Sequence, residues 1–310
     1  GTIDGQNTTG RSGMIFSNCA KVLVEDVELV NFGPKSTRVT GSDVILFAGC
    51  KKPCIVDGSV ITGGAARGIW TKGVTGSSLA GMLFIDNVIS DVNMDGIDFD
   101  SATSASSAFY NLCRNNIRYG IFVEEGAKHV QAFGNTCTGN EIGINVYSFD
   151  VGPTEKNTFA ANVLSANRRG PRFGARDTTP STSVLTRNNF AFNNRIGNSQ
   201  PLSAIDAQDD GSQNYVSQNL LVANAADYGS TSSATFFNSP ASSSTGADGA
   251  AHANVDFTAY TDGVLVGQDG WSTYGSNNAA PVAVSGGEAR LAGGANYQAA
   301  YKTIAPYQFA

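Results

Sequence analysis

The sequence predicts an all-β chain in which a parallel β-solenoid is followed by a small β-rich piece at the C-terminal end. Glycine accounts for 36 of the 310 residues, and Asn, Ser and Thr are abundant, a composition typical of many turns and short strands. Short β-branched runs recur at intervals of 24 to 30 residues. The runs lack the spacing of an amphipathic helix, so the recurring unit is built from strands.

The repeat follows a frame that reads N-x-h-x-x-N, then about two residues, then G-h-x-h, where h is apolar. One coil of this length cannot bury its own apolar side chains, but stacked coils share a continuous core. An Asn in the same bend of successive coils can hydrogen-bond along the stack. The frame therefore predicts a solenoid over residues 1–238, with these Asn positions: Asn87, Asn111, Asn135, Asn162, Asn189 and Asn219, then Asn116, Asn140, Asn167, Asn194 and Asn224.

The amino-acid composition of the sequence changes after residue 238. Residues 239–255 are rich in Ser, Ala and Gly, as expected of a linker. Residues 256–310 contain short apolar runs separated by turn residues, which predicts a small β appendage or the beginning of a sandwich.

Charge and hydropathy exclude two classes of partner. The net charge of −6 and the pI near 4.9 argue against nucleic acid, which needs a basic surface. No apolar run approaches the length of a membrane span. We therefore expect neither a nucleic-acid nor a membrane partner.

Five cysteines allow more than one interpretation. An odd number cannot pair completely within one chain, and neither Cys nor His spacing matches a zinc site. The cysteines are buried thiols, or else a disulfide joins Cys113 to Cys137, or Cys50 to one of its neighbours, Cys19 or Cys54.

Three segments of the chain resemble the pectin-lyase-like β-helix superfamily: GTIDGQ at 1–6, MIFSNCAKVLVEDVELVNF at 14–32 and NMDGID at 93–98. The polygalacturonases of that superfamily carry a similar IDGQG opening and an NTDG motif. Asn93, Asp95 and Gly96 match this motif, while Arg118 and Tyr119 stand where the family has paired aspartates. The resemblance implies a right-handed parallel β-helix and secretion. It also implies action on a polysaccharide as a hydrolase, lyase or epimerase, or glycan binding without catalysis as in tailspikes and adhesins.

Alternation along each strand predicts which side chains share a face of the solenoid. The inward positions hold apolar residues such as Ile97 and Phe99. The outward positions then form two columns along the stack: Trp70, Asp98, Phe122, Asn145 and Arg172 in the first, and Lys72, Asp100, Glu124 and Tyr147 in the second.

Three carboxyl groups are therefore expected to meet on one open outer face, from Asp98, Asp100 and Glu124. Two unit charges about 5 Å apart repel by roughly 1–3 kcal/mol. A retained proton, a bound cation or the flanking Lys72 and Arg172 can relieve this repulsion.

The leading hypothesis is a secreted glycoside hydrolase. A protonated acid would serve the leaving oxygen, and an ionised partner would activate water or attack the sugar. These roles are assigned to Asp98, Asp100 and Glu124, with no cofactor and a polysaccharide as partner. The expected substrate contacts are Trp70, Lys72, Phe122, Asn145, Tyr147, Arg172 and Arg176.

Two alternatives stay open at this point. In a polysaccharide lyase or C5 epimerase, Asp98, Asp100 and Glu124 would hold Ca²⁺ against a uronate, and Lys72 or Arg172 would remove the C5 proton. The other alternative is a glycan-binding or adhesive solenoid without catalysis. We also expect the first coil to be covered by upstream sequence or by another chain, since an open coil exposes strand edges.

Overall fold

The computed structural model describes the solenoid in detail and the C-terminal part in short strands. The described residues are 1–175, with gaps at 9, 11, 37, 40, 51–52, 74–79, 102 and 149–151; then 186, 189–192, 194–197, 203–207, 214–217, 219–222, 224, 226–231 and 236–238; and finally 263–264, 271–273, 283–285, 288–290 and 300–302. The chain divides into two compact units, Gly1–Gly249 and Ala250–Ala310.

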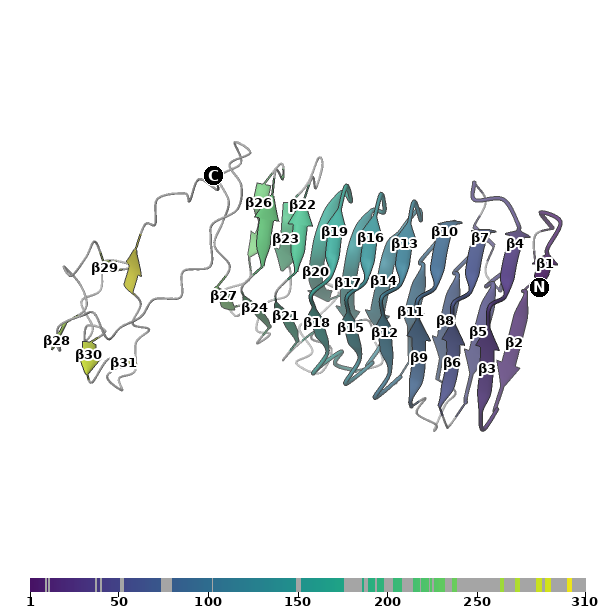
Figure 1. Ribbon diagram of the computed structural model, residues 1–310, viewed down its shortest axis with the longest axis horizontal. Coiled ribbons are helices and arrows are strands. Elements are labelled where there is room, and N and C mark those ends of the chain that lie inside the picture. The colour runs from purple at the N-terminus through teal and green to yellow at the C-terminus, as the bar shows by residue number, and fades with distance from the viewer. Residues whose placement is uncertain are drawn as a thin grey trace. The chain divides into compact units, whose positions relative to one another are not determined.

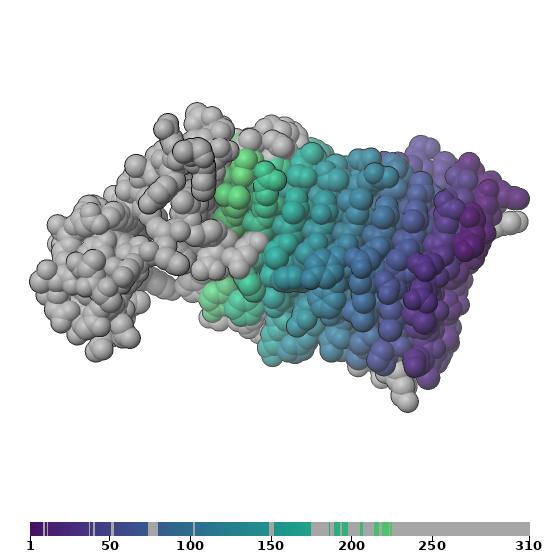
Figure 2. Space-filling model, viewed as in Figure 1, coloured from purple at the N-terminus to yellow at the C-terminus, as the bar shows by residue number. Residues whose placement is uncertain are grey.

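The first unit is a parallel β-helix made of three nine-stranded sheets, as the repeat predicts (Figure 1). Each coil contributes one strand to each sheet, and the coils follow one another in chain order, as the colour bands in Figure 2 show. Sheet A contains β1 (Thr2–Asp4), β4 (Glu28–Phe32), β7 (Val60–Gly64), β10 (Val88–Val92), β13 (Leu112–Arg114), β16 (Thr136–Thr138), β19 (Val163–Ser165), β22 (Arg195–Gly197) and β25 (Leu220–Val222).

The other two sheets repeat the same stacking order. Sheet B contains β2 (Met14–Ser17), β5 (Ile45–Ala48), β8 (Ile69–Lys72), β11 (Ile97–Phe99), β14 (Tyr119–Glu124), β17 (Ile142–Ser148), β20 (Arg169–Ala175), β23 (Ser203–Ala207) and β26 (Ala226–Thr231). Sheet C contains β3 (Val22–Glu25), β6 (Cys54–Asp57), β9 (Met82–Ile85), β12 (Ser107–Phe109), β15 (Gln131–Phe133), β18 (Thr158–Ala160), β21 (Phe190–Phe192), β24 (Tyr215–Ser217) and β27 (Phe236–Asn238).

The core of the β-helix consists of inward columns of apolar side chains. In sheet B, Ile97 lies between Ile69 and Ile121 on the neighbouring coils, and all three are fully buried. Phe99 stacks on Phe84 with ring centroids 5.5 Å apart. Each coil buries its apolar face only against its neighbours, so the stack and not the single coil is the stable unit.

Asparagine ladders run along the bends, as the frame predicts. The Asn111 side-chain amide donates to Asn135 Oδ1 at 2.9 Å, and the Asn135 amide donates to Asn162 Oδ1 at 3.0 Å. The same oxygens also accept backbone N–H groups, for example from Asn111 to Asn135 Oδ1 at 2.9 Å. The ladders thus satisfy buried backbone donors at the corners, where the strand hydrogen bonds stop.

All five cysteines are free thiols. Cys113 and Cys137 are register partners on β13 and β16 and lie fully buried in the core. The interpretation as buried thiols holds for Cys50, Cys54, Cys113 and Cys137, whereas Cys19 is half-buried, and none of the predicted disulfides is formed. Burial and the neighbouring Cys137 thiol raise the pKa of Cys113, which keeps it in the protonated, unreactive form.

The second unit is described through five short strands. They are β28 (Gly263–Val264), β29 (Trp271–Thr273), β30 (Ala283–Ser285), β31 (Glu288–Arg290) and β32 (Ala300–Lys302). Three of them form one antiparallel sheet, β28-β30-β31, and β29 pairs with β32. The described strands of this unit are antiparallel, and the predicted linker 239–255 lies outside the described residues.

No helix among the described residues has the length and apolar character needed to cross a lipid bilayer.

Candidate functional site

The strand register brings the predicted acids together on sheet B. Asp98 pairs with Trp70 on one side and with Phe122 on the other. Asp100 follows Phe99, whose register partner Val123 precedes Glu124. The two outward columns continue as predicted, through the pairs Phe122–Asn145, Asn145–Arg172, Glu124–Tyr147 and Tyr147–Gly174. We call Asp95, Asp98, Asp100 and Glu124 the carboxyl cluster.

The expectation of an open face is wrong. Asp98 is completely buried, and only 6% of Asp100 and 5% of Glu124 is exposed. Phe122 and Asn145 from the same columns are also buried, at 1% exposure each. Alternation set the direction of these side chains correctly, but it does not report what other side chains lie over them.

Arg67 supplies the main cover and the main positive charge. It lies in the bend before β8, and its Nε is 2.5 Å from Asp98 Oδ2 and 3.8 Å from Asp95 Oδ2. Its Nη1 is 3.4 Å from Asp43 Oδ1, and its guanidinium stacks 4.1 Å from the centroid of Trp70. A single buried guanidinium therefore contacts three buried carboxylates.

Arg118 closes the cluster from the opposite direction along the stack. Its Nε lies 3.6 Å from Asp95 Oδ1. Its guanidinium lies over the rings of Tyr119 and Phe122, at 4.6 and 5.4 Å from their centroids. These cation–π contacts hold the cation over the outer side of the sheet.

Asp100 is held by two side-chain donors. The Trp70 indole N–H donates to Asp100 Oδ2 at 3.0 Å, and the Ser101 hydroxyl donates to Asp100 Oδ1 at 2.6 Å. The same hydroxyl lies 3.2 Å from Glu125 Oε2. Trp70 thus acts as an anchor for a carboxylate, while Lys72 lies 4.9 Å from the centroid of its ring.

Burial and mutual repulsion change the protonation of the cluster. Burial, together with the negative charges of Asp98, Asp100 and Asp95, raises the pKa of Glu124 to about 11, against the lowering effect of Arg67. Burial also raises the pKa of Asp98 well above its ordinary value, although Arg67 opposes this. The pKa of Asp95 is raised by burial against Arg118 and Arg67. The raised pKa values of Glu124 and Asp98 indicate that the cluster retains at least one proton at neutral pH.

Several buried polar atoms of this face have no hydrogen-bond partner among the described residues. They include Asp98 Oδ1, both carboxylate oxygens of Asp95 and both side-chain atoms of Asn145. Buried polar groups in native proteins are nearly always paired. Their concentration on one face indicates a site that is completed by solvent or by a ligand.

The remaining predicted contact residues surround this face. Lys72 is exposed, whereas Tyr147 and Arg172 are half-buried, with the Arg172 guanidinium 5.4 Å from the Tyr147 ring centroid. Arg176 lies outside the described residues.

The sequence reasoning missed Asp43, Arg67 and the approach of Arg118 to Asp95. A signal was present, because Asp43, Arg67, Asp95 and Tyr119 each stand two positions before the first inward Ile of a sheet B strand. Extending the columns by one bend position would have placed Arg67 between two acids.

Calcium is a poor fit to the carboxyl cluster. Three of the cluster's oxygens already accept hydrogen bonds: Asp98 Oδ2 from the Arg67 guanidinium, and the two Asp100 oxygens from the Trp70 indole and the Ser101 hydroxyl. Hard divalent cations need several free oxygen ligands, and a buried guanidinium beside them adds repulsion. Within the described residues, no group of three or more His, Cys, Asp or Glu side chains is arranged to hold a metal ion.

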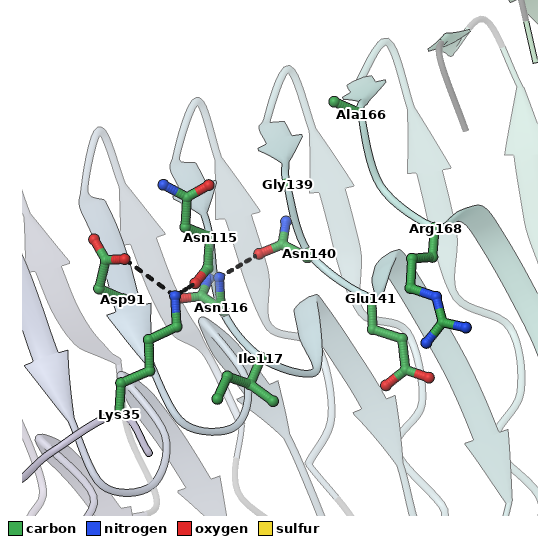
Figure 3. Close-up of a pocket in the computed structure, with 10 residues that line it drawn as sticks. All are labelled: Lys35, Asp91, Asn115, Asn116, Ile117, Gly139, Asn140, Glu141, Ala166 and Arg168. Carbon is green, nitrogen blue, oxygen red and sulfur yellow. Dashed lines mark hydrogen bonds and ion pairs between the residues drawn. The ribbon is translucent and has the colours of Figure 1, made fainter. Parts of the chain in front are cut away.

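A groove of about 650 Å³ lies beside the cluster, over the bends that precede β14, β17 and β20 (Figure 3). We call it the bend groove. Lys35 reaches into it from the segment between β4 and β5, where its ammonium lies 3.1 Å from Asp91 and also contacts the Asn115 carbonyl oxygen. Glu141 and Arg168 line the other end. The lining of amides and of charges of both signs is suited to a polar ligand.

A family comparison agrees with this architecture. The model of the right-handed β-helix region matches residues 2–164, which is more than half of the chain. The chain belongs to this family. No curated protein matches the sequence of this right-handed β-helix.

Solved structures share the fold of this right-handed β-helix. A periplasmic alginate epimerase is similar with a TM-score of 0.53 and 15% identity, over 71% of this chain and 49% of its own. The A-module of a mannuronan C-5 epimerase from Azotobacter vinelandii gives 0.50 and 13%, over 69% and 63%. Pectate lyase Pel9A gives 0.51 and 11%, over 80% and 71%. The chain spans about half of the periplasmic epimerase, and the likeness establishes the pectin-lyase-like fold.

Proposed function

We propose that this right-handed β-helix is a secreted carbohydrate-active enzyme that hydrolyses glycosidic bonds in a polysaccharide. The observation that carries the proposal is the buried Glu124 beside Asp98 and Asp100, with its pKa raised to about 11. Glycoside hydrolysis needs one carboxyl group that donates a proton and a second that acts in the ionised form. The proposal is also supported by the fold, which the chain shares with proteins described as alginate epimerases and a pectate lyase.

We assign the proton donor to Glu124 and the ionised partner to Asp100. Asp100 receives hydrogen bonds at both oxygens, which suits an acceptor-only carboxylate. Asp98 maintains the raised pKa of Glu124 by its negative charge. In hydrolysis, the Glu124 proton passes to the leaving glycosidic oxygen as the C–O bond breaks. Asp100 takes a proton from the attacking water or forms the bond to the anomeric carbon itself.

The charge of the site favours a neutral polysaccharide over a uronate. Of the five buried carboxyl groups, those of the carboxyl cluster and Asp43, only Asp43, Asp95 and Asp98 contact a guanidinium group, from Arg67 or Arg118. A uronate would add another carboxylate to a region that already retains a proton to limit repulsion.

A lyase or C5 epimerase acting on a uronate polymer is the second candidate. It is favoured by the names of the similar structures, which include alginate epimerases and a pectate lyase. Lys72, which is exposed, would then be the base. The poor fit of Ca²⁺ to the carboxyl cluster makes the lyase or epimerase the weaker candidate.

Product analysis separates the two candidates. The protein is incubated with neutral and with uronic polysaccharides, and reducing ends and the ultraviolet absorbance of unsaturated sugars are both recorded. Hydrolysis gives reducing ends alone, whereas a lyase gives absorbance as well, and epimerisation changes neither. Proton exchange at C5 detects the epimerase. If no reaction is observed with any of these polysaccharides, the proposal is refuted.

A matched pair of variants tests the assignment of Glu124. Glu124→Gln is expected to lower the rate of hydrolysis by about 10²- to 10⁴-fold, since it removes the proton donor. Glu155→Gln is the control, because Glu155 has the same 5% exposure but pairs with Lys128, away from sheet B. Equal activity of both variants would remove Glu124 from the mechanism.

A further inference from the structure

Sheet C has an aromatic groove that is separate from the carboxyl cluster of sheet B. The groove has a volume of about 400 Å³ and is lined chiefly by Phe109, Tyr110, Gln131, Phe133, Thr158 and Ala160. Tyr110 is 58% exposed and Phe133 is 42% exposed. Exposed apolar side chains that adjoin one another in a groove are a feature of ligand-binding surfaces.

The two aromatic rings form a fixed corner. Their centroids are 6.0 Å apart and their planes are at 87°. The Tyr110 ring lies over Gly134 of the next coil, where an added Cβ would be 2.5 Å from a ring carbon. Gly134 therefore leaves room for the ring to lie against the backbone, which keeps the other ring face toward solvent.

Polar groups and a second aromatic pair extend the groove along the stack. Gln131 pairs in register with Thr158, and Thr158 pairs with Phe190. Phe190 in turn stacks on Tyr215, with centroids 5.0 Å apart and planes at 7°. The nearest rings of the two pairs, Phe133 and Phe190, thus lie two coil steps apart, or roughly 10 Å along the axis. Gln131 shares a strand with Phe133, and Thr158 lies on the coil between the two rings.

From this geometry we propose that the aromatic groove binds a neutral oligosaccharide segment that runs along the helix axis. The C–H faces of sugar rings pack on Tyr110 and Phe133, and their hydroxyl groups hydrogen-bond to Gln131 and Thr158. None of the lining residues is charged, so the groove offers no partner for the carboxylate of a uronate. The choice of a sugar as occupant rests on the proposed function. In that function, the groove holds the polymer on a different sheet from the one that cleaves it.

A second copy of the chain is the competing occupant. A stable protein interface buries roughly 800 Å² on each partner and is closely packed. A narrow concave groove flanked by polar side chains fits a slender ligand better than a flat protein surface. The test therefore includes the oligomeric state.

Affinity electrophoresis measures the binding directly. Full-length protein is run in gels that contain a β-glucan, a galactomannan or a xylan, with alginate and polygalacturonate as anionic comparators. The wild type is expected to be retarded by at least one neutral polymer. The double variant Tyr110→Ala/Phe133→Ala is expected to bind that polymer about tenfold more weakly. Ile15→Ala is the control, because Ile15 on β2 of sheet B is 61% exposed and distant in sequence from the groove.

Four results would overturn the inference. They are no retardation of the wild type by any neutral polymer, equal retardation of the double variant, equal weakening in Ile15→Ala, and retardation by the anionic polymers alone. A dimer that becomes a monomer in the double variant would likewise assign the groove to a second copy. Thermal denaturation of each variant shows whether it is folded, and Gln131→Ala tests the groove again if the double variant is not.

The outcome is distinguishable from failure of the proposed function. Hydrolysis of short soluble oligosaccharides depends on Glu124 and is expected to be unchanged in the double variant. Retardation of Glu124→Gln is expected to equal that of the wild type. Loss of retardation without loss of hydrolysis in the double variant supports the groove, while a Glu124→Gln variant that still hydrolyses refutes only the proposed mechanism.

Discussion

Replacement of Arg67 by methionine tests whether one cation holds the carboxyl cluster together. The guanidinium contacts Asp98 at 2.5 Å, Asp43 at 3.4 Å and Asp95 at 3.8 Å, and Arg67 is only 9% exposed. Methionine has a similar length and flexibility, so it fills much of the same space without the charge. The substitution therefore leaves buried acids without their principal partner.

The cost follows from the burial of those acids. Removal of one partner from a buried ion pair destabilises a protein by about 3–5 kcal/mol. A loss of that size lowers the melting temperature by roughly 6–20 °C if the chain behaves as a domain of 150–250 residues does. Because Arg67 lowers the pKa of Asp43, Asp95 and Asp98, these acids bind protons more readily in the variant. Protonation removes their buried charge, so the destabilisation is expected to shrink as the pH falls.

Thermal denaturation of the wild type and of Arg67→Met at pH 5 and pH 8 measures both effects. Arg114→Met is the control, since Arg114 on β13 is exposed, and it should change the melting temperature little. The double variant Arg67→Met/Asp98→Asn should recover part of the loss, because it removes a buried charge together with its partner. If Arg67→Met has the same melting temperature as the wild type at pH 8, this cation does not hold the cluster together.

Three further predictions follow from other parts of the β-helix. Because the pKa of Glu124 is raised to about 11, the folded chain binds one proton more than the unfolded chain at any pH between the ordinary pKa of Glu and this raised value. This group therefore lowers the free energy of unfolding by up to about 1.4 kcal/mol per pH unit as the pH rises. Glu124→Gln should remove this slope and be more stable than the wild type at pH 8, as urea titrations at several pH values would show; parallel slopes would contradict the assignment. Asn135→Ala should destabilise the chain by about 2–4 kcal/mol, because Asn135 is fully buried and its loss leaves the Asn111 backbone N–H and the Ala108 carbonyl without this hydrogen-bond partner. Chemical denaturation measures the change in the free energy of unfolding. A change as small as that caused by Arg114→Ala, at an exposed position, would refute a role for the ladder. Gly120→Ala should cost about 1–3 kcal/mol, since a Cβ there would lie 2.6 Å from the Gly143 carbonyl oxygen and 2.7 Å from Cys137 Sγ. A melting temperature equal to that of the wild type would show that the neighbouring coils can move apart at this position of β14.

The frame of the repeat was sufficient to predict the columns of this protein. Asn111 and Asn135 fall at one bend and Ile97 and Ile121 at one inward position, because a solenoid maps a fixed spacing in sequence onto a fixed place on the coil. The alternation of strands then placed Asp98 and Glu124 on the outer side.

The alternation of strands could not predict which side chains cover the site. Arg67 and Lys35 come from bends, whose lengths differ from coil to coil and whose directions do not follow the strand alternation. Lys35 reaches Asn115, which is 80 residues away in sequence. Contacts of this kind depend on the conformation of each bend, and a pattern of period two cannot specify them.

The sequence by itself determined the repeating coil, the inward apolar columns and the pairing of the acids on neighbouring coils, because backbone periodicity controls all three. Only the tertiary structure decided that those acids are buried under Arg67 and Arg118 and that the pKa of Glu124 is raised. Burial and electrostatic energy depend on distances between side chains from several coils, and these distances are set when the bends pack against the sheet.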